Sequence, residues 1–161
     1  MKLLIGGSPS KKFHLEEFRR ALEGLGVQTK LVMDTEIYTG FPSRKISDWF
    51  QTKNKFERLI SDFKPDVILV DRQRHFAQIA SNSLIPLIIH LRGNIWEETK
   101  WARETTYNSF FKKIILQKWT DMATYTFQKS TLIIPICKYL EKIVKQHYPD
   151  KNTGVISSGI D

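Results

Sequence analysis

Several side chains that can bind a phosphate or a sugar stand directly or shortly after short apolar runs of the sequence. They are glycines, a serine, arginines, a histidine and glutamates: Gly6, Gly7, Ser8, Arg72, Arg74, His90, Arg92, Glu97 and Glu98. A guanidinium presents a fixed fork of donors to a phosphate or carboxylate. A neutral imidazole can exchange a hydrogen bond with a sugar hydroxyl at little cost in charge. These residue types indicate a site for a phosphorylated ligand, a sugar or both.

Each of these residues also has a structural explanation, which the sequence leaves open. Gly6 and Gly7 let backbone N–H groups approach a ligand, because no Cβ stands in the way. Two glycines after a strand also allow the chain to reverse. The arginines could serve only to pair with Asp71 and the two glutamates, and His90 could be a packed histidine with its hydrogen bonds satisfied.

Several motifs that would identify other chemistries are absent. The sequence contains neither G-x-G-x-x-G nor G-x-x-x-x-G-K-[ST], which argues against a dinucleotide fingerprint and against a P-loop. Its histidines, at positions 14, 75, 90 and 147, have no zinc-site spacing, and no G-x-S-x-G elbow occurs. The single cysteine, Cys137, permits no internal disulfide and indicates a reducing compartment. We therefore expect no metal site and no serine hydrolase.

The elements that must position these side chains alternate between strand-like and helix-like patterns. Apolar runs typical of buried strands occur at residues 3–5, 27–33, 67–70, 87–89, 132–134 and 155–157, and helical spacing occurs at 15–25, 56–63 and 139–147. This alternation predicts an α/β fold, a Rossmann-like parallel sheet with helices on both faces. Ligands of such sheets bind outside the carboxyl ends of the strands, where the candidate residues would lie.

Two segments depart from this alternation. Residues 34–52 are too long for an ordinary connection and form a candidate binding loop. Residues 92–128 are mostly helical, with the apolar positions between Tyr107 and Met122 on one side. Lys112, Lys113, Lys118 and Trp119 there combine basic and aromatic side chains, which suits contact with an anionic membrane surface. A core helix with a solvated polar face is the alternative.

Composition and charge bound the classes of partner. The chain has 161 residues, 41% of them hydrophobic, which fits one domain, and a formal net charge of +8. Residues 100–160 hold ten Lys or Arg against four acidic residues. This excess favours an anionic partner on that third of the chain, such as phospholipid or a phosphorylated substrate, unless it only serves solubility. Nucleic acid is less favoured, because no nucleic-acid-binding motif accompanies the charge.

Three segments resemble the N-terminal domain of retaining nucleotide-sugar glycosyltransferases with the GT-B fold, the family 4 or group 1 transferases that include phosphatidylinositol mannosyltransferases. The segments are the Gly6-Gly7 turn followed by HLEEFRRALEGLGVQTKLV, the strand PLIIHLRGN, and TLIIPICKYLEKIVKQHYPDKNTGVISSGID. The third is the most specific, since it is similar to the family's strand, helix, Tyr-Pro and closing hinge. Ser158, Cys137 and HLRGN depart from the family pattern and weaken any assignment of the acceptor.

The resemblance implies an activity and a domain organisation. It implies transfer of a sugar, with retention of configuration, from a nucleotide-diphosphate sugar to a glycan or lipid-linked acceptor, with no further cofactor. Residues 1–161 would form one acceptor-side domain, inactive alone and followed by a C-terminal donor-binding domain. Gly6 and Gly7 would lie near the donor phosphate and the acceptor, and His90 would contact the transferred sugar. Arg92, Glu97 and Glu98 rest on their location in the sequence alone.

The location and the rival functions follow from the same observations. No apolar run reaches the length of a membrane span and no signal peptide is evident, so we expect a cytoplasmic protein, peripheral on the inner membrane face if the basic helix contacts lipid. One rival is a non-enzymatic, flavodoxin-like module that binds a phosphorylated ligand through Arg72, Arg74 and Arg92. The other is a nucleotide-binding oxidoreductase that uses the glycine pair and Asp34.

Overall fold

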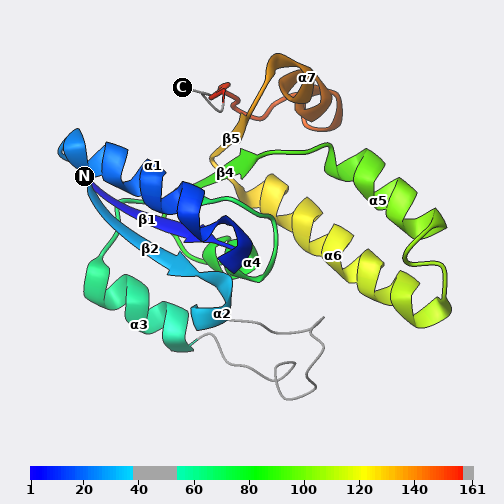
Figure 1. The fold of residues 1–161 in the computed structure, drawn as a ribbon, viewed down its shortest axis with the longest axis horizontal. Helices are drawn as coiled ribbons and strands as arrows, with labels where there is room; N and C mark the ends of the chain where they lie inside the picture. Colours follow the sequence, from blue (N-terminus) through cyan, green and yellow to red (C-terminus); the bar gives the residue numbers. More distant parts are fainter. Residues whose placement is uncertain (38–53, 158–161) are drawn as a thin grey trace.

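A single parallel sheet forms the centre of the protein. The computed structural model describes residues 1–37 and 54–157, and in these residues five parallel strands follow the order β2-β1-β3-β4-β5 (Figure 1). The strands are β1 (Lys2–Gly7), β2 (Gln28–Met33), β3 (Val67–Val70), β4 (Leu87–Leu91) and β5 (Leu132–Pro135). The predicted fold class is confirmed, because the sheet is parallel, Rossmann-like and part of an α/β fold.

One face of the sheet is covered by α1 (Lys12–Gly24). Its buried Leu15 belongs to an apolar cluster with Ile5 of β1 and Leu69 of β3. Alternate residues of the same strands point to the other face, as the period of two along a strand requires. The central strands are therefore apolar throughout, because both of their faces are buried.

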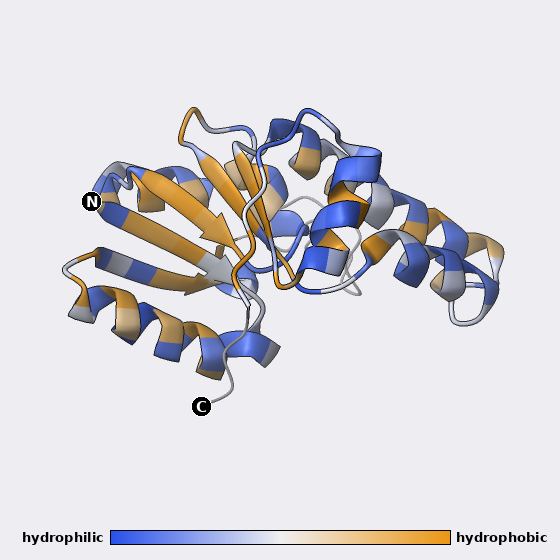
Figure 2. Cartoon of the chain, turned by 90° about the horizontal axis from the view of Figure 1, so that it is seen from above, coloured by the Kyte–Doolittle hydropathy of each residue, from blue (hydrophilic) through white to orange (hydrophobic). Residues whose placement is uncertain are grey.

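The opposite face is covered by α3 (Asn54–Phe63), α4 (His75–Ala80) and α6 (Phe110–Lys129). These helices contribute Phe56, Phe76 and Phe127 to one buried cluster, to which Val144 of α7 (Lys138–His147) is added. Figure 2 shows the apolar strands between helices whose outer sides are polar. Helices on both faces hold the strand ends in fixed positions, which is what a site at the edge of the sheet requires.

The helices α5 (Ile95–Glu104) and α6 lie side by side and extend beyond the sheet as the α5–α6 hairpin (Figures 1 and 2). The start of α5 is anchored by Trp96, whose ring stacks on His147 at 4.1 Å and on Phe127 at 5.6 Å between centroids. At the far end Arg103 donates a hydrogen bond of 2.9 Å to Gln117. These contacts hold the start of α5 against the rest of the protein and hold α5 against α6, so the hairpin has a fixed position relative to the strand ends.

Residues 92–128 are mostly helical, as expected, but the structure divides them between α5 and α6. Ser109 stands at the N-cap of α6 with an extended backbone, φ −86° and ψ 157°. Threonine, asparagine and serine, which fill most of this break, favour turns and caps over helix interiors. Phe110 and Phe111, expected on the same side as the buried Met122, are 75% and 78% exposed.

Other element boundaries also differ from the sequence prediction. The glycine pair lies inside β1 and not in a turn, and His90 lies inside β4 and not after it. The prediction of a strand at residues 155–157 is wrong, because the structure has none there. Beside β5 the structure has an isolated bridge of Ile133 with Thr153, and Ile156 donates a single hydrogen bond of 3.2 Å to Pro135. Pro135 has no N–H with which to continue a ladder.

Two further elements are short: one precedes α1 and the other follows β2. A short 3-10 helix, η1 (Pro9–Lys11), leads into α1, and α2 (Asp34–Ile37) begins the predicted binding loop, whose remainder lies outside the described residues. The helix α4 was not predicted from the sequence. Across residues 1–37 and 54–157, none of the helices has the length and apolar composition to cross a membrane.

Candidate functional site

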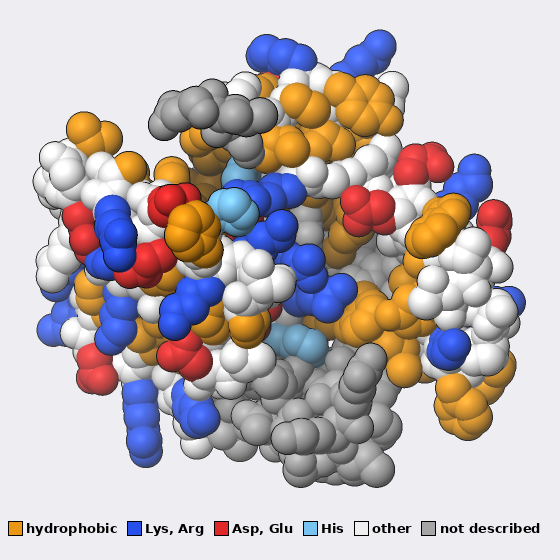
Figure 3. Space-filling model, in the orientation of Figure 1, with side chains coloured by type: hydrophobic (Ala, Val, Ile, Leu, Met, Phe, Trp, Pro, Cys, Tyr) orange, Lys and Arg blue, Asp and Glu red, His pale blue; other side chains and the backbone are white. Residues whose placement is uncertain are grey.

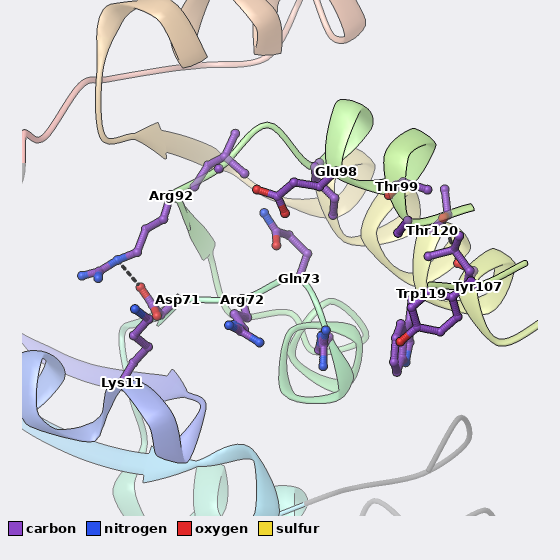
Figure 4. A pocket seen from close by; sticks show the side chains of 16 residues that line it. Lys11, Asp71, Arg72, Gln73, Arg92, Glu98, Thr99, Tyr107, Trp119 and Thr120 are labelled. Carbon is purple, nitrogen blue, oxygen red and sulfur yellow. Dashed lines mark hydrogen bonds and ion pairs between the residues drawn. The ribbon is translucent and has the colours of Figure 1, made fainter. Parts of the chain in front are cut away.

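A cavity of about 420 Å³ lies outside the carboxyl ends of the central strands. Its wall on the sheet side comes from residues that follow β3 and β4, together with Lys11 of η1. Its opposite wall comes from the inner side of the α5–α6 hairpin (Figure 4). The sheet runs from β1 to β2 in one direction and from β1 through β3 in the other, and a parallel α/β sheet commonly binds its ligand at such a reversal.

Positive charge dominates the sheet side of this cavity. Lys11, Arg72, Arg74 and Arg92 line it, against the carboxylates of Asp71 and Glu98. Figure 3 shows Lys and Arg side chains gathered in the hollow between the sheet and the hairpin, beside apolar side chains of the hairpin. The arrangement favours an anionic ligand, because converging cations in a partly enclosed site concentrate the field.

Asp71 is the buried carboxylate at the centre of the site. It follows β3 and is 4% exposed. Its N–H donates a hydrogen bond of 3.0 Å to the carbonyl of Gly6. The Nε of Arg92 lies 2.8 Å from Oδ1 of Asp71, and Nδ1 of His90 lies 3.3 Å from the same oxygen. A carboxylate only accepts hydrogen bonds, so Asp71 favours the tautomer of His90 with the proton on Nδ1.

Arg74 and Trp119 join the basic wall of the cavity to its aromatic wall. The guanidinium of Arg74 lies 4.5 Å from the centroid of the Trp119 ring, and Tyr107 meets that ring edge-on at 5.6 Å. A guanidinium over an indole is a favourable cation–π arrangement. Burial, and then the like charge of Arg72, lower the pKa of Arg74. Two guanidinium groups therefore share this end of the cavity.

Asp34 stands at the start of α2, beside the same arginines. Burial raises the pKa of Asp34 to about 6, and Arg74 and Arg72 oppose this rise. Its carboxylate is therefore mostly ionised at pH 7 and becomes neutral in mildly acidic solution. The cavity and its surroundings gain positive charge as the pH falls through 6.

A second cavity, of about 270 Å³, lies between α1 and the strands and shares Asp71 and Arg92 with the first. His90 lines this second cavity, together with His14 and Ile156. The Nε2 atom of His90 is covered and has no hydrogen-bond partner among the described residues. His90 does not line the larger cavity. It contacts Asp71, which lines both cavities.

The structure brings together part of the predicted site. Arg72, Arg74, Arg92 and Glu98 line the larger cavity, and His90 joins them through Asp71. Glu98 also lies where a Cβ on Gly93 would stand. Glu97 is exposed and lines neither of the two cavities; its N–H donates to the side chain of Asn94, the N-cap of α5.

The glycine pair and Ser8 lie beside the site and not on the walls of either cavity. A Cβ on Gly6 would overlap the ring of Phe76, and one on Gly7 would overlap Leu15. Both positions thus have a packing reason to be glycine, because α4 and α1 approach β1 closely there. Ser8 is buried, and its hydroxyl lies 2.9 Å from that of Ser10. A contact of these residues with ligand stays a prediction.

The residues predicted to contact a membrane separate into two groups. Lys112, Lys113 and Lys118 are exposed on α6, whereas Trp119 turns inward to the cavity. The exposed aromatic neighbours of the lysines are Phe110 and Phe111. Membrane contact through the lysines stays a prediction, with these two phenylalanines as the apolar partners in place of Trp119.

Several cavity residues were not recognised as site residues from the sequence. Asp71 was considered only as a partner for arginine, and Tyr107 only as part of an apolar helix side. Gln73, Thr99 and Thr120 also line the cavity. The position of Asp71 directly after a buried strand was a usable signal, whereas the hairpin residues gave none. Within residues 1–37 and 54–157, no cluster of His, Cys, Asp and Glu suits a metal ion.

The fold and the position of the cavity define the class: a Rossmann-like domain that resembles one half of a UGT of the GT-B fold. No family model and no curated protein matches the sequence. Among solved structures, the chain is similar to Glycyrrhiza uralensis UGT73P12 complexed with glycyrrhetinic acid 3-O-monoglucuronide, with a TM-score of 0.53 and 11% sequence identity. The match covers 96% of this chain and 42% of the plant protein, so the chain spans less than half of that protein's length. At this identity the likeness shows the fold alone.

Proposed function

We propose that the chain is the acceptor-side half of a glycosyltransferase that uses a nucleotide-diphosphate sugar. In the reaction an acceptor hydroxyl forms a bond to the anomeric carbon, the bond from that carbon to the diphosphate oxygen breaks, and the hydroxyl proton is released. The products are the glycoside and the nucleoside diphosphate. The acceptor is a glycan or a lipid-linked molecule held in the larger cavity.

The observation that carries this proposal is the basic cavity at the carboxyl ends of β3 and β4. The leaving diphosphate gains negative charge as the glycosidic bond breaks, and fixed cations that face it stabilise the transition state. Arg72 is the guanidinium best suited to this role, because among the described residues it has neither the carboxylate partner of Arg92 nor the ring contact of Arg74. The likeness in fold to part of a UGT supports the proposed class of enzyme.

His90 is proposed to contact the transferred sugar from the wall of the second cavity. Asp71 holds its ring through Nδ1, so the imidazole has one preferred orientation. Because Nδ1 faces Asp71 and Nε2 is covered, His90 would meet the sugar through its ring carbons and would not accept the acceptor proton in this conformation. Retention of configuration rests on the family resemblance alone. The anomeric configuration of the isolated product, determined by NMR, tests it.

Partners follow from the same proposal. A donor-binding domain of the same enzyme would complete the cleft and hold the nucleotide, so residues 1–161 alone would not turn over. The lysines of α6 would hold the enzyme against an anionic membrane surface on the cytoplasmic side. Nucleic acid has no place in this proposal.

Sugar transfer is tested with the natural gene product, a panel of nucleotide-diphosphate sugars, and membrane lipid and glycan fractions as acceptors. Incorporated sugar is measured by mass spectrometry. We expect transfer from one donor and a loss of at least tenfold in kcat/KM for His90→Ala. The control Arg58→Ala, on the exposed side of α3, should retain wild-type activity. A His90→Ala rate within about twofold of wild type, under 0.5 kcal/mol of barrier, denies His90 its role.

A non-enzymatic module that binds a phosphorylated ligand is the second candidate. The strand order 2-1-3-4-5, which flavodoxin-like domains also have, favours it. Saturable binding of a phosphorylated ligand by the natural gene product, with no transfer from any nucleotide sugar, would support this candidate over the glycosyltransferase. The oxidoreductase alternative, with Asp34 as a ribose ligand, predicts tight NAD binding, which calorimetry tests directly.

A further inference from the structure

The second cavity, of about 270 Å³, has a floor made by three neighbouring strands: Leu69 of β3, His90 of β4 and Ile134 of β5. His90 lies opposite Ile134 in the register of the sheet, and Leu69 lies opposite Ile88. Alternate residues of a strand share a face, so Ile88 and His90 point the same way. All three floor residues therefore lie on the face of the sheet against which α1 packs.

Within the described part of the chain, this floor offers a ligand no free hydrogen-bonding group. Nδ1 of His90 lies 3.3 Å from Oδ1 of Asp71, and Nε2 of His90 is covered by protein. Oδ2 of Asp71, at the end of the floor, is covered as well. A group that rests on the floor meets aliphatic side chains and the ring carbons of His90.

The polar side chains of the second cavity lie at its outer side. His14 and Glu17 are exposed residues of α1, and Ser157 is an exposed residue beyond β5. Imidazole, carboxylate and hydroxyl groups can all exchange hydrogen bonds with sugar hydroxyls. A sugar in this cavity would therefore turn hydroxyl groups towards solvent and an apolar edge towards the floor.

The two cavities meet at Asp71 and Arg92, which line both of them. Under the proposed function the leaving diphosphate lies in the larger cavity and His90 contacts the transferred sugar, so the sugar ring enters the second cavity. Sites for drug-sized ligands commonly have volumes of about 300–1,000 Å³. The smaller volume of the second cavity suits a single sugar ring.

We propose that the transferred sugar is a 6-deoxy hexose, whose methyl group rests against Leu69, Ile134 and Ile156 in the second cavity. This inference rests on the proposed function for the location of the sugar and names the class of donor. C6 is the carbon outside the ring, so loss of its hydroxyl leaves a methyl group. A C6 hydroxyl at this place would be buried without a partner, which disfavours the ordinary hexose.

The test compares pairs of donors that differ only in the C6 hydroxyl, with the natural gene product and the acceptor fractions named above. The pairs are GDP-mannose with GDP-D-rhamnose, UDP-galactose with UDP-D-fucose, and UDP-glucose with UDP-6-deoxyglucose. We expect kcat/KM to be at least tenfold higher for the deoxy member of the pair that the enzyme uses. An apolar pocket discriminates against an added hydroxyl by up to about a hundredfold.

Variants of Ile156 assign the preference to this cavity. Ile156→Asn adds a hydrogen-bonding side chain beside the floor and should reduce the preference for the deoxy donor at least fivefold. Ile156 is 51% exposed, so the fold should tolerate the change, which circular dichroism checks. Leu84→Asn makes the same kind of change at a fully exposed position outside both cavities and should keep the wild-type preference. If Ile156→Asn does not fold, Ile156→Ala replaces it and should lower kcat/KM for the deoxy donor more than for its partner.

The outcomes divide between this inference and the function on which it rests. Transfer with equal kcat/KM for both members of the pair overturns the 6-deoxy assignment and leaves the glycosyltransferase function in place. A preference that Ile156→Asn and Leu84→Asn both leave unchanged overturns the assignment to the second cavity. Absence of transfer from every donor overturns the proposed function, and the inference with it.

Discussion

Asp71 is the residue on which the site depends, because it lines both cavities and contacts both Arg92 and His90. Its carboxylate is buried, and such a group is stable only while its oxygens have partners. Arg92 and His90, at the end of β4 one strand away, both contact Oδ1, whereas Oδ2 has no partner among the described residues. The pair thus links two strand ends and holds the wall of the larger cavity in place.

Removing Arg92 should destabilise the fold, since it leaves the buried carboxylate of Asp71 with His90 alone. We expect Arg92→Ala to lower the free energy of unfolding by about 1–3 kcal/mol, at the low end because the Arg92 side chain is 32% exposed. Urea denaturation measures this. In the double variant Arg92→Ala/Asp71→Asn part of the loss should return. If the double variant lost the sum of the free energies lost by the two single variants, Arg92 and Asp71 would not be energetically coupled.

Asp34 makes stability depend on pH. Its folded pKa of about 6 lies above its ordinary value of 3.8, so the folded state binds the proton more tightly than the unfolded state. Stability therefore falls as the pH rises from about 4 to about 6 and stays lower above that window, by at most about 3 kcal/mol. Asp34→Asn should unfold like the wild type at pH 4 and be more stable at pH 7. If wild type and Asp34→Asn were equally stable at pH 7 as well as at pH 4, the raised pKa of Asp34 would be contradicted.

At the scale of elements, β1 meets helices on both of its faces at Gly6 and Gly7. We expect Gly6→Ala to destabilise the protein by about 1–3 kcal/mol or more, because the fully buried Phe76 ring has no space to move away. Gly24→Ala is the matched control. Nothing lies within 4 Å of a Cβ there, so it should be neutral or stabilise α1 by up to about 1 kcal/mol. Thermal denaturation of both variants provides the comparison.

The α5–α6 hairpin presents different chemistry on its two sides. Its inner side forms the aromatic wall of the cavity, whereas Phe110, Phe111 and the lysines of α6 face solvent. An element that extends beyond the sheet can contact a surface while its inner side stays available to a ligand. The membrane proposal therefore concerns the outer side alone.

Reversing two charges on that outer side tests the membrane proposal. Lys112→Glu/Lys113→Glu should weaken binding to vesicles that contain anionic lipid by more than tenfold, since each basic residue near such a surface contributes about 1 kcal/mol. Co-sedimentation with anionic and neutral vesicles measures it. The control Lys55→Glu/Lys142→Glu makes the same charge change on exposed positions of α3 and α7. Equal binding of the wild type to neutral and anionic vesicles would remove the proposal.

At the scale of the whole molecule, the cavity lies on a sheet edge that opens to solvent. Its sheet-side wall is basic, and its far wall combines the rings of Tyr107 and Trp119 with polar side chains of the hairpin. Under the proposed function, this half determines which acceptor enters, and the nucleotide is held elsewhere.

Most of the fold could be predicted from the sequence, because the signals that specify it are local. Five of the six expected strands occur, since runs such as Val67–Val70 must be buried on both faces wherever they lie. The residues at the carboxyl ends of the strands, including Arg72 and Arg92, were identified for the same reason. The interruption before α6 was missed, because the apolar spacing continues across it.

The sequence by itself determined the alternation of strands and helices and the positions of the chemically active residues relative to the strand ends. Only the tertiary structure decided which of these residues meet: Asp71 with Arg92 and His90, Arg74 with Trp119, and the glycine pair with Phe76 and Leu15. Hydrophobic periodicity reports the surroundings of one element at a time. The approach of residues on different elements depends on strand order and helix packing, which short-range patterns do not contain.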